Sequence, residues 1–155
     1  MDLVNQMRTR LLAVLGRLDW LPPLVGRLAV GLLFVSTGWG KVQDIGKVTQ
    51  YFEHLGIPAP GFNAVLVGYS ELICGSLLVL GLFTRLATVP LIASMIVAIL
   101  TARRSELHGV FDLVGFEEFT YLTVLVMIAI LGPGKIALDR ALSRALGWEA
   151  ASRAP

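Results

Sequence analysis

The amino-acid sequence predicts an all-α protein, an integral membrane four-helix bundle with amphipathic interfacial helices at the N-terminus, in the first loop and at the C-terminus. Three observations support this fold class. The 155 residues are 55% hydrophobic and only 15% charged, whereas soluble domains contain about 25% charged residues. Four apolar runs resemble membrane spans in length and composition. Basic residues flank these runs, as is typical of membrane proteins.

Residues 1–23 form the first segment, in which Leu, Val and Met alternate with the basic residues Arg8, Arg10 and Arg17. This pattern predicts an amphipathic helix on the anionic cytoplasmic face of the membrane. A frayed tail with a few leucines is the alternative. Pro22 and Pro23 are expected to end the helix and turn the chain.

The membrane domain is predicted at residues 24–134, with spans at about 24–42, 62–83, 86–102 and 116–131. In the first loop, apolar residues fall on one helical face, which predicts a short interfacial helix: Ile45, Val48, Phe52 and Leu55. The turn Gly132-Pro133-Gly134 ends the fourth span. Residues 135–155 are predicted to be an interfacial cytoplasmic tail with a helical pattern.

The distribution of Lys and Arg predicts the orientation. With four spans, nine basic residues lie on the side of the termini and four on the other, so the termini are expected in the cytoplasm. Arg103 and Arg104, which fall on the outer side, oppose this assignment.

Glu71 lies near the middle of the second predicted span. An ionisable residue at that depth costs roughly 2.5–3.5 kcal/mol on insertion scales, so it usually has a partner and often a function. We expect its side chain to face the bundle. The carboxyl is either ionised and paired with a basic residue, or protonated and hydrogen-bonded. A structural clasp between helices and a role in a proton, ion or quinone site are both compatible with this position.

Small residues share a face with polar ones in the first two spans. Gly31 and Gly38 lie on one face of the first, and Gly68 and Gly75 on one face of the second. Because packing joins helices in lipid, such faces are expected to approach another helix closely.

The candidates for ligand binding or proton relay are Lys41, Glu71, Glu117, Glu118 and Tyr121. Lys41 and the two later glutamates are predicted on the same side of the membrane, so an ion pair of Lys41 with Glu117 or Glu118 is expected. Tyr121 follows Glu117 by four residues, which places a phenol and a carboxylate on one helix face. Acidic residues at a helix N-terminus are also favoured by the helix dipole alone.

Three further polar residues are candidates for a structural ion pair on the inner side, namely Arg27, Arg85 and Asp139. Either arginine is expected to meet Asp139 or a lipid phosphate. As simple anchors at the two ends of the first span, Arg27 and Lys41 would need no further explanation.

Several functions receive no support. Cys74 is the single cysteine, so an intramolecular disulfide is impossible. His54 and His108 lie on different connections, and no cluster with metal-ligand spacing is present, so no metal site is predicted. The net charge of +2 comes without a basic stripe, so nucleic-acid binding is not predicted.

Four stretches, RLAVGLLFVSTGWGKV, GIPAP, SELICGSLLVLGLFTRLA and GPGKIALD, occur in this order. In order and spacing they resemble the DoxX family, over roughly residues 24–139. The polar positions of the family's motif fall on Arg27, Lys41, Glu71, Arg85, the Glu117–Glu118 pair and Asp139.

The resemblance implies a multi-pass protein of a bacterial inner membrane. Some relatives are membrane subunits of quinone-linked oxidoreductases, so it implies a membrane subunit or anchor of a redox complex and at most a subunit of such an enzyme. A quinone is the cofactor it raises. The implied partners are the lipid bilayer, a protein redox partner and a second copy of the chain. The fold also resembles that of thiol-oxidising quinone reductases, whose paired cysteines this sequence lacks.

Two other functions remain open. One is a non-catalytic membrane scaffold or assembly factor, in which all the charges are structural clasps. The other is a small-solute transporter, which is less favoured because the spans carry isolated charges and no paired discontinuities.

Overall fold

The computed structural model describes residues 2–139 and 142, and this part of the chain is helical without a strand. The predicted all-α class is therefore confirmed. In order, the helices are α1 (Asp2–Arg17), α2 (Leu21–Gln43), α3 (Ile45–His54), α4 (Pro60–Leu80), α5 (Thr84–Thr101), α6 (Val110–Gly115) and α7 (Glu117–Leu131).

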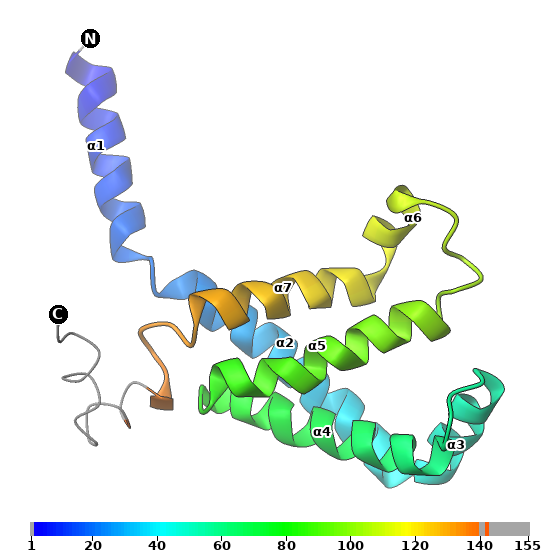
Figure 1. Ribbon diagram of the computed structural model, residues 1–155. Coiled ribbons are helices and arrows are strands. Elements are labelled where there is room, and N and C mark those ends of the chain that lie inside the picture. The colour runs from blue at the N-terminus through cyan, green and yellow to red at the C-terminus, as the bar shows by residue number, and fades with distance from the viewer. Residues whose placement is uncertain (1, 140–141, 143–155) are drawn as a thin grey trace, which may run out of the picture.

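Four helices, α2, α4, α5 and α7, form an antiparallel bundle (Figure 1). α4 packs along α2, α5 lies between α4 and α7, and α7 returns to α2. α1 projects from one end of the bundle, which we call the tail end. Residues 132–139, which we call the tail-end segment, lie at the same end. α3 and α6 lie at the opposite end, the loop end.

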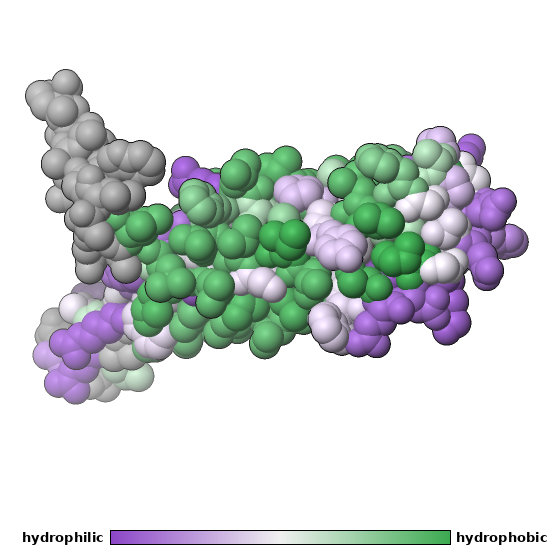
Figure 2. Space-filling model, turned by 90° about the horizontal axis from the view of Figure 1, so that it is seen from below, coloured by the Kyte–Doolittle hydropathy of each residue, from purple (hydrophilic) through white to green (hydrophobic). Residues whose placement is uncertain are grey.

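Three helices in the described part are long and apolar enough to cross a membrane, and these are α2, α4 and α5. Apolar side chains cover the middle of the bundle and hydrophilic ones gather at its ends (Figure 2). α7 has 15 residues, fewer than the about 20 usual for a membrane span. The count of four spans therefore stays a prediction.

The core is formed by buried side chains from all four bundle helices: Val30, Phe34, Leu78, Ala87, Leu91, Met95, Leu125 and Ile128. Between α2 and α4 the backbones come unusually close. A Cβ added to Gly75 would lie 2.8 Å from the Val35 nitrogen and 3.0 Å from the Gly31 oxygen. The close approach expected from the small residues is thus confirmed.

The structure corrects two predicted boundaries. Pro22 and Pro23 do not end the first helix, because α1 already ends at Arg17 and the prolines occupy the first turn of α2. That position costs no hydrogen bond, since the first helical N–H groups have no partner inside the helix. The helix of the second predicted span, α4, ends at Leu80 and not at about residue 83, because Gly81 adopts a left-handed conformation with φ of 68° and caps it.

The helix predicted in the first loop is confirmed as α3, whose N-terminus is capped by Asp44 through a 3.1 Å hydrogen bond from the Lys47 N–H. α6 was not predicted, since its residues were assigned to a connection. α1 is confirmed as a helix, and its place on the membrane surface stays a prediction. Most of the predicted tail, 135–155, lies outside the described residues.

Candidate functional site

The Glu71 carboxylate is buried in the interior of the bundle. Its side chain is 1% exposed and projects from the middle of α4. Side chains on a helix lean toward its N-terminus, which for α4 is the loop end. The carboxylate is therefore directed toward the last turns of α2, which run antiparallel to α4.

Three donors surround this carboxylate. Lys41 forms an ion pair with Oε2, and the Thr37 hydroxyl donates to the same oxygen at 3.0 Å. The Ser94 hydroxyl on α5 donates to Oε1 at 3.2 Å. We call these four residues the Glu71 cluster. Both carboxylate oxygens are thus occupied, which offsets the cost of burying the charge.

Lys41 connects the Glu71 cluster to the surface of the bundle. Its side chain is 29% exposed, so the ammonium is neither enclosed nor free in solvent. An ammonium carries three N–H donors. Besides the N–H group bonded to Glu71, it has N–H groups that can donate hydrogen bonds to a molecule at the bundle surface.

The expected ion pair between Lys41 and Glu117 or Glu118 is wrong, because Lys41 pairs with Glu71. Glu118 pairs instead with Arg103, whose Nε lies 3.1 Å from its Oε1. This hydrogen bond raises the pKa of Arg103 above its ordinary value. The expected contact of Tyr121 with Glu117 is present as a 3.4 Å hydrogen bond from the phenol to the carboxylate.

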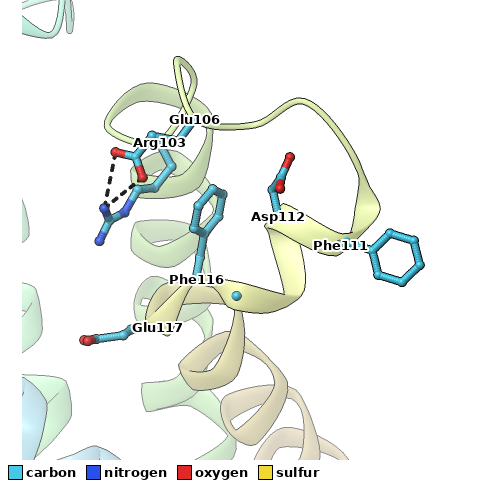
Figure 3. Close-up of a pocket in the computed structure, with 7 residues that line it drawn as sticks. Arg103, Glu106, Phe111, Asp112, Phe116 and Glu117 are labelled. Carbon is cyan, nitrogen blue, oxygen red and sulfur yellow. Dashed lines mark hydrogen bonds and ion pairs between the residues drawn. The ribbon is translucent and has the colours of Figure 1, made fainter.

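A pocket of 520 Å³ opens at the loop end, between the end of α5, α6 and the start of α7 (Figure 3). Its lining is mostly charged or aromatic: Arg103, Glu106, Phe111, Asp112, Gly115, Phe116 and Glu117. The Arg103 guanidinium also lies 5.6 Å from the centre of the Phe116 ring, within cation–π distance. The pocket shares no residue with the Glu71 cluster.

At the tail end, Arg27 is 2% exposed and binds the tail-end segment. Its Nη1 donates to the carbonyl of Pro133 at 2.7 Å and its Nη2 to that of Ile136 at 2.8 Å. Its Nε is buried without a partner among the described residues. Arg27 therefore fixes the chain just after α7.

Asp139 caps α5 from a distance. Its carboxylate accepts the N–H groups of Phe83, at 2.6 Å, and Thr84, at 3.0 Å. The expected ion pair of Asp139 with Arg27 or Arg85 is thus replaced by bonds to backbone amides at a helix N-terminus, where negative charge is favoured. Arg85 Nη2 donates to the Ile130 carbonyl at 3.2 Å.

Sequence reasoning missed Thr37, Ser94 and Arg103 as partners of the glutamates. Thr37 lies four residues before Lys41, so helical spacing alone could have placed both on one face. Ser94 gave no such signal, since serine hydroxyls in helices commonly bond to their own backbone.

The fold and site define a class of protein: a helical membrane protein that holds a buried, fully hydrogen-bonded carboxylate inside its bundle. The model of the DoxX family matches residues 23–104, more than half of the chain. The chain therefore belongs to the DoxX family. No solved structure matches it.

Two of the relatives are named as membrane proteins and a third as an oxidoreductase. The chain is 38% identical to the uncharacterised membrane protein Rv3486 of Mycobacterium tuberculosis, over 76% of this chain and 79% of that protein. It is 29% identical to the inner membrane protein YqjF of Escherichia coli, over 78% and 92%. It is 35% identical to CatD of Bacillus subtilis, a proposed oxidoreductase by its name, over 75% and 83%.

Proposed function

We propose that this protein is a membrane subunit or anchor of a redox complex in a bacterial inner membrane, and that the Glu71 cluster serves a quinone. The observation that carries the proposal is the Lys41–Glu71 ion pair, which joins a buried carboxylate to a partly exposed ammonium. The oxidoreductase name of CatD supports the redox part.

The residues present fit a quinone head in one way. Glu71 is shielded and its oxygens are already occupied, so it cannot touch a ligand. Lys41 is partly exposed and can donate a hydrogen bond to a quinone carbonyl. Glu71, held by Thr37 and Ser94, then acts as a positioning residue for the ammonium. A bound quinone would supply the two-electron, two-proton redox chemistry.

The remaining features of the proposal follow from the sequence. Residues 24–134 form the membrane domain, flanked by the interfacial segments 1–23 and 135–155, with both termini in the cytoplasm. A protein partner supplies or accepts the electrons, because the quinone is the one redox group proposed here. Association of two copies is compatible with the large apolar surface (Figure 2).

Quinone binding tests the proposal. The full chain is reconstituted in nanodiscs and titrated with a short-chain ubiquinone analogue, and bound quinone is measured after rapid separation. We expect saturable binding that is lost in Lys41→Met and weakened in Glu71→Gln. Glu53→Gln is the matched control, since Glu53 is exposed on α3. Absence of saturable binding by the wild-type protein, or equal binding by all variants, would contradict the proposal.

One observation favours the second candidate, a non-catalytic scaffold or assembly factor. Every oxygen of Glu71 already has an internal donor, which is what a purely structural clasp requires. This candidate predicts no quinone binding by any variant. It also predicts that Glu71→Gln, although less stable, still supports the cellular role of the protein.

A further inference from the structure

α7 is too short to cross the membrane alone. Its 15 residues extend about 22 Å at about 1.5 Å per residue. The hydrocarbon core of a bilayer is about 30 Å thick. In the predicted topology α7 crosses the membrane, so some other part of the chain must cover several ångströms of apolar thickness beside it.

The missing length lies at the loop end. At the tail end, the last residues of α7 lie beside the first residues of α5, as the hydrogen bond from Arg85 to the carbonyl of Ile130 shows. From there α5 continues for 18 residues and α7 covers only 15 in the opposite direction. Arg103, just past the end of α5, accordingly reaches Glu118 in the first turn of α7.

α6 occupies this position. It precedes α7, separated only by the buried residue Phe116 (Figure 1). Three apolar side chains of α6 are exposed, with Val110 at 76%, Phe111 at 93% and Val114 at 59%. Phe111 contributes to the lining of the loop-end pocket, and its ring lies on the side of α6 away from Arg103 (Figure 3).

Several polar groups around α6 already have partners within the protein. Asp112 accepts the His108 N–H at 3.0 Å, which closes the turn that starts α6. Arg103 neutralises Glu118 and also contacts the Phe116 ring. Because Arg103 and Glu118 neutralise each other, placing the apolar side of α6 in lipid brings neither of them close to the lipid as an unpaired charge.

We propose that α6 is immersed in the boundary between the hydrocarbon and the headgroups, with Val110, Phe111 and Val114 among the lipid acyl chains. In this position α6 completes the apolar thickness that α7 lacks. The occupant of the apolar face of α6 is thus the bilayer itself. The short helix would thereby fix how deep the loop end and the loop-end pocket lie in the membrane.

Spin labelling tests this position. Cys74 is first replaced by alanine, and a nitroxide is then attached at Phe111→Cys or, as the matched control, Asp112→Cys. In nanodiscs, accessibility to oxygen, which partitions into lipid, is compared with accessibility to a water-soluble nickel chelate. We expect an oxygen-to-nickel ratio severalfold higher at position 111 than at position 112.

A second pair keeps the test decisive if the Phe111 variant fails to fold. A label at Val114→Cys should behave like a lipid-facing site, and one at Glu106→Cys like a water-facing site. Equal accessibility of all labels to nickel would overturn the proposal. So would a label at 111 or 114 that is open to nickel in nanodiscs and becomes shielded only when inner-membrane proteins are added, since the occupant would then be a protein.

Discussion

Removing Lys41 should destabilise the protein more than removing the charge of Glu71. Lys41→Met leaves a carboxylate that is 1% exposed without its counter-charge, and breaking a buried pair in this way costs about 3–5 kcal/mol. Because Lys41 is 29% exposed, we expect the lower part of that range. Glu71→Gln leaves an ammonium that can turn toward the surface, so the loss is about 1.5–3 kcal/mol, that of a charged hydrogen bond.

The double variant separates this reasoning from a general packing effect. Once the carboxylate is replaced by a neutral amide, the absence of the ammonium no longer leaves a buried charge. Lys41→Met combined with Glu71→Gln should therefore lose less stability than the sum of the two single variants, with a coupling energy of about 2 kcal/mol.

The assay is equilibrium unfolding in mixed micelles, followed by far-UV circular dichroism, for the wild type, both single variants and the double variant. Lys47→Met is the control for loss of a lysine, since Lys47 pairs with Asp44 at the surface, where such pairs contribute little. The reasoning is refuted if the two single effects add in the double variant within about 0.5 kcal/mol.

Three further predictions concern the helix contacts and the two ends of the bundle. Gly38→Ala should strongly lower the stability, because the added Cβ would overlap the α4 backbone. Gly40 faces open space, so Gly40→Ala should raise the stability by about 1 kcal/mol. Equal effects of the two variants in thermal unfolding would contradict the close packing. Arg27→Met should release the tail-end segment, which limited trypsin digestion detects as rapid cleavage after its lysine; resistance equal to that of the wild type would refute the anchoring role. Hydrogen bonds from the side chain and N–H of Lys47 hold the pKa of Asp44 below its ordinary value. The capping contribution of Asp44 to stability is therefore complete above the pKa that Asp44 has in the unfolded chain. It is lost as the pH falls through the lower pKa of the folded protein. Carboxyl NMR titration should show this pKa rising in Lys47→Met, and an unchanged value would count against the contact.

The bundle was predictable because its determinants are local. Apolar length and flanking charge gave the positions of α2, α4 and α5 within a few residues. The periodic spacing of Ile45, Val48, Phe52 and Leu55 gave α3. The error at the end of α4 has a local cause as well, since a glycine inside an apolar run does not reveal that it adopts the left-handed conformation of a helix cap.

The partners of the charged residues were less predictable, because they depend on how the helices rotate against each other. Glu71 was correctly expected to face the bundle. Lys41 was assigned to the wrong glutamates, because that assignment used only the side of the membrane on which each residue was predicted. The real pairing requires the antiparallel register of α2 and α4, which the close glycine contacts fix. Asp139 illustrates the same point, because its target is the backbone at the start of a helix more than fifty residues earlier, and backbone amides leave no signature in a sequence.

Solid-state NMR in lipid bilayers tests most directly whether the acidic group of α4 is tied to the amine of α2. In protein labelled with ¹⁵N at lysine side chains and ¹³C at glutamate carboxyls, we predict strong dipolar dephasing between Lys41 Nζ and Glu71 Cδ, which disappears in Lys41→Met. A Glu71 carboxyl that shows no dephasing from any lysine in the folded wild-type protein would contradict the account.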